Sequence, residues 1–65
     1  MKSRAKIGNN LRKLRGEKSL SEVAKSLGIT PQAVHNYEMG NRVPTDEIKT
    51  KISKYYKTSV QDLFY

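Results

Sequence analysis

The chain has 65 residues, no cysteine and a formal net charge of +7, with a sequence pI of about 9.9. We expect a single domain, residues 1–65, and the lack of cysteine excludes a disulfide framework and thiol chemistry. No apolar run is long enough for a signal peptide or a membrane span, so we expect a cytoplasmic protein. The positive charge favours a polyanionic partner.

The first sixteen residues form a basic segment that contains no acidic residue. Apolar residues recur in it at the spacing i, i+4, i+7, at Ile7, Leu11 and Leu14. This spacing predicts a helix over 4–15, with Ser3 as its N-cap and Gly16 as its stop. Gly8 inside this helix costs about 1 kcal/mol relative to alanine, so we expect the first turn to fray.

A second helix is predicted to begin at Ser19. Together with Glu22, Ser19 matches the S-x-x-E capping box, in which each side chain bonds the free backbone N–H of the other residue. The apolar residues behind this signal follow the i, i+3, i+4, i+7 spacing of one helix face, at Leu20, Val23, Ala24 and Leu27. Gly28 then ends the helix, because glycine most easily adopts the left-handed conformation found just past a helix end.

A third helix is predicted over 31–39. Thr30 is a good N-cap, and Pro31 suits the first helical position, where it loses no hydrogen bond. The turn between the second and third helices therefore consists of Gly28 and Ile29, and Ile29 is free to enter the core. This arrangement of two short helices around a tight turn is that of a helix-turn-helix.

The side of the third helix that faces away from the core carries no lysine, arginine or aspartate. Measured from Val34 at about 100° per residue, this side holds Gln32, His35, Asn36 and Met39. Glutamine or asparagine can bond adenine N6 and N7 together, so the face suits a reader of the DNA major groove. The alternative is an ordinary polar surface with no partner.

The stretch resembles the Cro and phage-repressor (XRE-like) helix-turn-helix family, and the resemblance extends from Ile7 to Phe64. It rests on the small residue at the helix crossing, the turn glycine, the packing positions and the end of the third helix, namely Ala24, Gly28, Ile29, Val34, Tyr37 and Glu38-Met39-Gly40. The resemblance implies an all-α, compact five-helix domain of the lambda-repressor type.

By the same resemblance, double-stranded DNA is the expected partner. Base contacts are expected from Thr30, Pro31, Gln32, Ala33 and Asn36, to which we add His35 on the same face, although His35 is equally explained as an ordinary exposed histidine. Phosphate contacts are expected from Lys18, Ser19, Asn41 and Arg42. The loop after the third helix is expected to present free backbone N–H groups as well.

The resemblance also implies one structural contact, and the sequence differs from the family pattern at three places. Arg15 is expected to pair with Glu38 in a partly buried ion pair that ties the first helix to the third. Leu20 and Pro31 stand where the family usually has glutamines, and the loop before the second helix is two residues short. These departures remove expected contacts, so binding should depend more on Gln32 and Asn36.

The rest of the chain predicts two more helices. Thr45 caps a helix whose apolar face consists of Ile48, Ile52, Tyr55 and Tyr56, while its lysines, Lys49 included, are expected to be solvated. Ser59 starts a short last helix, in which Val60, Leu63 and Phe64 close the core. Apolar groups near the chain's end that one domain cannot bury completely are expected to form a homodimer contact, namely Tyr56, Phe64 and Tyr65.

Catalysis is not expected, because the chain has one histidine, no cysteine, no metal-ligand spacing and no nucleophile paired with a base. We therefore expect no cofactor, no metal and no small-molecule ligand. Every apolar stripe is needed for the core, which disfavours a membrane surface as partner. The leading hypothesis is a bacterial or phage transcriptional regulator, in the simplest case a repressor that acts as a dimer at an operator. The alternative is a protein-interaction module, such as an antitoxin or adaptor, which the exposed Met39 favours.

Overall fold

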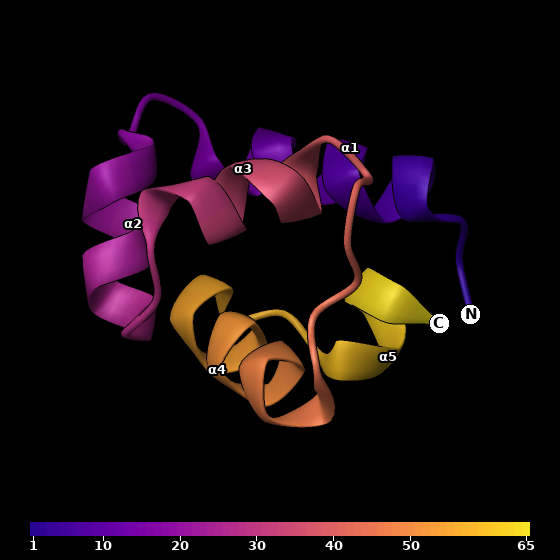
Figure 1. Cartoon of the computed structure of the whole chain (residues 1–65). Helices are drawn as coiled ribbons and strands as arrows, with labels where there is room; N and C mark the ends of the chain where they lie inside the picture. Colours follow the sequence, from indigo (N-terminus) through magenta and orange to yellow (C-terminus); the bar gives the residue numbers. More distant parts are fainter.

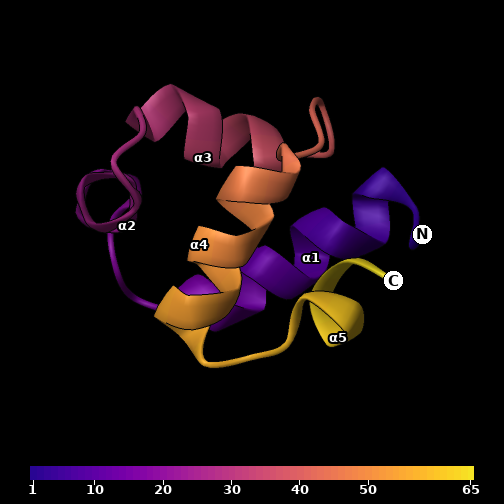
Figure 2. The same cartoon turned by 90° about the horizontal axis from the view of Figure 1, so that it is seen from below.

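The computed structural model describes all residues 1–65 and consists of five helices without strands. The helices are α1 (Arg4–Arg15), α2 (Leu20–Leu27), α3 (Pro31–Glu38), α4 (Asp46–Tyr56) and α5 (Val60–Phe64). In Figure 1, α3 and α1 lie above α4, α2 stands across one end of the molecule, and α5 lies at the other end beside both termini. Figure 2, seen from below, looks down the axis of α2 and shows α4 crossing in front of the others. The predicted all-α five-helix fold is confirmed.

Each helix begins at a serine or threonine whose hydroxyl oxygen accepts a hydrogen bond from a backbone N–H three residues later. These N-caps are Ser3, Ser19, Thr30, Thr45 and Ser59, with bonds of 3.0–3.4 Å. At α2 only half of the capping box forms, because Glu22 does not return a side-chain bond to Ser19. The third helix ends one residue earlier than predicted, since Met39 is its C-cap.

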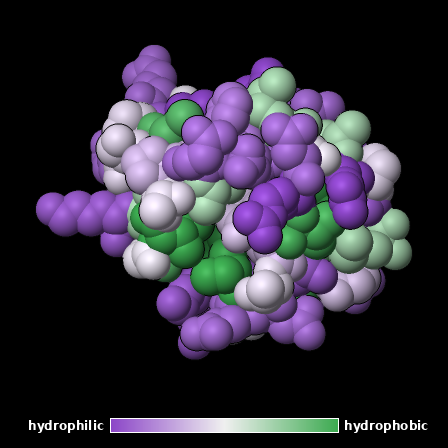
Figure 3. Space-filling view, in the orientation of Figure 1, coloured by the Kyte–Doolittle hydropathy of each residue, from purple (hydrophilic) through white to green (hydrophobic).

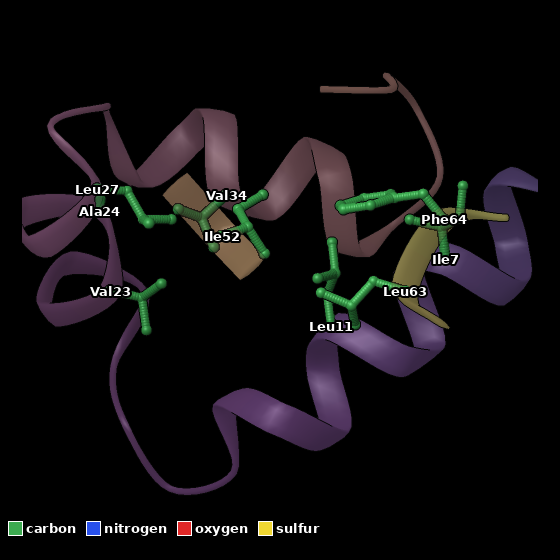
Figure 4. Close-up of a cluster of buried hydrophobic side chains, with 9 residues drawn as sticks. All are labelled: Ile7, Leu11, Val23, Ala24, Leu27, Val34, Ile52, Leu63 and Phe64. Carbon is green, nitrogen blue, oxygen red and sulfur yellow. The ribbon is translucent and has the colours of Figure 1, made fainter. Parts of the chain in front are cut away.

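The core joins all five helices. Figure 4 shows its nine buried apolar side chains, which are Ile7, Leu11, Val23, Ala24, Leu27, Val34, Ile52, Leu63 and Phe64. Phe64 is completely buried, at 0% exposure. The prediction that Phe64 closes the core is therefore correct, and the expectation that it retains apolar surface for a dimer contact is wrong.

Gly8 is the point at which α1 touches α3. It is buried, and a β-carbon placed on it would overlap the main-chain carbonyl oxygen of Glu38. A larger residue would push the two helices apart. The prediction treated Gly8 as a weak position in the first turn, but α1 is helical from Arg4 and the glycine serves a close approach.

Lys49 is not a solvated lysine of α4, as predicted, but is buried at 6% exposure. Its ammonium group donates to the Tyr65 hydroxyl at 3.1 Å, approaches the sulfur of Met1 at 3.6 Å and lies 5.5 Å from the centre of the Phe64 ring. The exposed carboxylate of Asp46 lies 3.8 Å away. Lys49 thus connects the middle of the chain to both of its ends.

Candidate nucleic-acid interface

α2 and α3 are joined by the turn that the sequence predicts. Gly28 adopts the left-handed conformation with φ of 71°, and its N–H group donates to the carbonyls of Ala24 and Lys25. The N–H of Ile29 also donates to the Ala24 carbonyl, at 3.0 Å. These bonds satisfy the carbonyls at the end of α2 and direct the chain into α3 after only three residues.

The outer face of α3 carries two amide side chains that bond each other. Gln32 Nε2 donates to Asn36 Oδ1 at 3.1 Å, which the i, i+4 spacing allows. The bond leaves the Gln32 oxygen free as an acceptor and the Asn36 NH₂ group free as a donor. Gln32 is exposed, whereas Asn36 is half-buried. The hydrogen bond therefore orients the two amide groups relative to each other.

The other expected base contacts surround this amide pair. Pro31 and His35 are exposed and Ala33 is half-buried. The oxygen of Thr30 is already engaged, since it accepts from the N–H of Ala33 at 3.1 Å. Polar side chains cover the part of the surface formed by α3 in Figure 3. Met39 is the large apolar exception, at 52% exposure, and the Arg12 guanidinium lies 3.7 Å from its sulfur.

The loop after α3 presents mainly side chains rather than backbone donors. The N–H groups of Asn41 and Arg42 both donate to the carbonyl of Asn36, at 2.9 and 3.4 Å. The expectation of free N–H groups in this loop is therefore wrong for Asn41 and Arg42, whose N–H groups satisfy the end of α3, whereas the N–H of Val43 makes no hydrogen bond. The side chains of Asn41 and Arg42 are exposed, and Arg42 has no partner within the chain.

The two expected phosphate contacts before α2 are partly engaged. Lys18 donates to the Tyr55 hydroxyl at 3.2 Å, and its ammonium group lies 4.8 Å from the centre of that ring. Ser19 accepts the α2 capping bond from Glu22 N–H at 3.0 Å, which leaves its own O–H free to donate. Both groups keep free donors, since the Lys18 ammonium has two further N–H groups and Ser19 has its O–H.

Arg15 and Glu38 hold α1 and α3 together through a two-pronged ion pair. Arg15 Nε donates to Glu38 Oε2 at 2.7 Å and Nη2 donates to Oε1 at 3.1 Å. A third donor, Nη1, bonds the Lys18 carbonyl at 2.7 Å and so fixes the loop before α2. Glu38 is only 5% exposed. The hydrogen bond with Glu38 raises the pKa of Arg15 above its ordinary value.

Tyr56 of α4 lies close to this ion pair. Burial, with a smaller contribution from the negative charge of Glu38, raises the pKa of Tyr56 to about 12. The ring also makes an edge contact with Tyr55, with 4.9 Å between the ring centres. Tyr56 therefore helps to shield the Glu38 carboxylate from water, and this buried charge lies at the end of α3.

One basic residue near this face was not singled out from the sequence. The backbone of Arg4, at the start of α1, lies against Gly40, where an added β-carbon would be 3.4 Å from the Arg4 carbonyl carbon. Arg4 is exposed and therefore stands beside the loop that carries Arg42. From the sequence, only the lack of acidic residues in 1–16 pointed to Arg4, because Gly40 is distant from Arg4 along the chain.

The fold and this face define a helix-turn-helix domain. A family model described as "Helix-turn-helix" matches residues 11–63, which is most of the chain. The chain therefore belongs to the helix-turn-helix family of the Cro and phage-repressor (XRE-like) type, a family of DNA-binding regulators. No curated protein and no solved structure matches the chain. No helix is long and apolar enough to cross a membrane, and no group of metal-ligating side chains occurs.

Proposed function

We propose that the protein is a transcriptional regulator that binds double-stranded DNA sequence-specifically, with α3 in the major groove. The observation that carries the proposal is the hydrogen-bonded pair of Gln32 and Asn36 on an outer face without lysine, arginine or aspartate. Amides in this position can donate to and accept from base edges, whereas a plain solvated helix face is usually charged. The Arg15–Glu38 pair supports the orientation of that face.

The charge distribution supports binding to the phosphate backbone. The formal net charge is +7, and Arg42 and Arg4 stand on the edge beside α3. In this proposal Arg42, Asn41, Ser19 and Lys18 position the domain, while Gln32, Asn36, Pro31, Ala33, Thr30 and His35 contact or approach the bases. Repression is the simplest output, because occupation of an operator by itself excludes other proteins from it. The site of action is then the cytoplasm of a bacterium.

We further propose that two copies bind as a symmetric dimer. One recognition helix reaches only three or four base edges, so two half-sites about 34 Å apart are needed to define an operator. Tyr65, at 48% exposure, and the half-buried Tyr56 offer surface for such a contact, and Phe64 does not. A small core also gains stability from association.

Selection from a pool of randomised duplexes with the purified protein tests the proposal. We expect an enriched, palindromic sequence and a footprint of two symmetric halves. Sedimentation of the free protein then shows whether the dimer forms before or on the DNA. Recovery of no enriched sequence would contradict sequence-specific binding, and a single half-site protected by a monomer would contradict the dimer.

The competing function is a protein-interaction module that uses the same α3 face. Exposed Met39 and the lack of cations on this face favour it. The salt dependence of binding to random duplex DNA separates the two functions, because each neutralised phosphate contributes roughly −0.9 to the slope of log affinity against log salt. A slope near zero favours the protein partner.

A further inference from the structure

An open groove lies between the C-terminal half of α2 and the outer side of α4. Its lining consists of Lys25, Ser26, Leu27, Gly28, Lys51, Lys54 and Tyr55. The groove is wide open to solvent, whereas the gap in the core holds only about 10 Å³. Figure 1 shows α2 descending from the level of α3 to that of α4, which places this groove away from the outer face of α3. None of the groove's lining residues is among the proposed DNA contacts.

The groove is positively charged and contains no carboxylate. Lys25 and Lys54 form no ion pair, and Lys51 only approaches Glu47 at 4.0 Å. Lys18, proposed above as a phosphate contact, lies over the Tyr55 ring but does not line the groove. Lysines brought together without counter-charges repel one another, so an anionic occupant would relieve an existing cost.

The walls between the lysine head groups are apolar. The ring of Tyr55 and the methylene stems of the lysines form most of them, and Leu27, which is only 4% exposed, contributes little. A DNA duplex is convex and has no apolar group on its phosphate backbone to place there. The groove also offers no backbone donor at Gly28, whose N–H is already bonded to carbonyls of α2. The chemistry fits carboxylates that flank an apolar side chain.

We propose that this groove, which we call the lysine groove, binds an acidic peptide segment of a partner protein. Carboxylates of the segment pair with Lys25, Lys51 and Lys54, and an apolar side chain between them lies against the ring of Tyr55 and the stems of the lysines. Because the groove and the α3 face are separate, the partner binds the protein whether or not DNA is present. The proposal therefore does not depend on the proposed function.

A titration of the ¹⁵N-labelled protein tests the lysine groove. The probe is a synthetic peptide of aspartate and glutamate residues around one central leucine, added to millimolar concentration at low salt. We expect shifts of the backbone amides at 25–28 and 51–55, with those of α3 unchanged. The double variant Lys51→Glu/Lys54→Glu should bind roughly tenfold more weakly. Its own spectrum reports whether it is folded.

The matched control is Lys6→Glu/Lys13→Glu, which changes the net charge equally at exposed positions of α1. This control should retain most of the affinity. Equal losses in both double variants would reduce the effect to long-range attraction and overturn the proposal, as would the absence of shifts in the groove. An all-glutamate peptide that binds equally well would overturn the apolar subsite. Shifts of the same amides with random duplex DNA would reassign the groove to nucleic acid.

Discussion

The α-carbon of Gly8 faces the main-chain carbonyl of Glu38 so closely that no β-carbon fits between them. Helix propensity alone predicts that Gly8→Ala stabilises α1 by about 1 kcal/mol. The contact predicts the opposite sign, because an overpacked helix crossing typically loses about 1–3 kcal/mol. Urea unfolding measures the difference. Asn9→Ala, at an exposed position of the same helix, is the control and should be neutral or slightly stabilising. Stabilisation by Gly8→Ala would show that the crossing relaxes easily.

Removal of Arg15 should be among the most damaging single changes. Arg15→Ala leaves the buried Glu38 carboxylate without a counter-charge, which costs roughly 3–5 kcal/mol. Glu38→Gln should cost less, since the guanidinium that remains reaches water. Thermal and urea unfolding check both variants. Arg12→Ala, which removes a neighbouring exposed arginine, should stay within about 0.5 kcal/mol of the wild type. Similar effects of Arg15→Ala and Arg12→Ala would mean that the pair contributes nothing net.

Stability should fall at alkaline pH through Tyr56. In the folded protein the Tyr56 hydroxyl keeps its proton until about pH 12, whereas in the unfolded chain it loses the proton near its ordinary pKa of 10. The contribution of Tyr56 to the free energy of unfolding is therefore complete below pH 10. It is lost as the pH rises from 10 to 12, and the loss is at most about 2 kcal/mol for a half-buried group. Unfolding measured across this range should be less steeply pH-dependent in Tyr56→Phe. Identical pH profiles for the two proteins would rule the effect out.

The amide pair makes a prediction about coupling. Gln32→Ala and Asn36→Ala should each lose roughly 1–3 kcal/mol at one or two base pairs of a selected site and little on random DNA. Because Gln32 donates to Asn36, each single change also releases the other amide, and the double variant should lose less than the sum. Binding to a selected duplex and its point variants measures this. Equal losses on selected and random DNA would show that the amides do not read bases.

Arg42 separates phosphate contacts from base contacts. Arg42→Ala should weaken binding about uniformly across sequences and lower the salt slope by roughly one unit. Lys54→Ala changes the charge equally on α4, away from α3, and should leave the slope unaltered. Titrations at several salt concentrations compare the two. The same slope for Arg42→Ala and the wild type would make Arg42 an ordinary surface residue.

Local signals allowed the fold to be predicted, because they act over three or four residues. The caps at Ser19 and Thr30 and the stop at Gly28 depend only on nearby backbone groups, and all of them form. Burial of Lys49 and the contact of Gly8 with Glu38 could not be predicted in this way. Both arise where segments distant in sequence meet, and no spacing within one helix records such a meeting.

The candidate site likewise contains features that local patterns predict and features that they do not. Apolar periodicity identified the outer face of α3, but it could not show that the N–H groups of Asn41 and Arg42 turn back to Asn36, since that bond depends on how the helix ends. The Arg15–Glu38 pair was predicted from the family resemblance and not from the spacing of residues. The lysine groove combines residues of α2 and α4, which the sequence separates by more than twenty positions.

The meeting of the two ends at Lys49 makes the fold a candidate for circular permutation. The Lys2 N–H donates to the Phe64 carbonyl at 2.8 Å, and Figure 1 shows the termini side by side. A short glycine linker can join them without disturbing a helix, and new ends can open between the exposed Gly16 and Glu17. The five helices would then run in the order α2, α3, α4, α5, α1, with the outer face of α3 unaltered, and a reporter could be fused to either of the new ends, at Gly16 or Glu17.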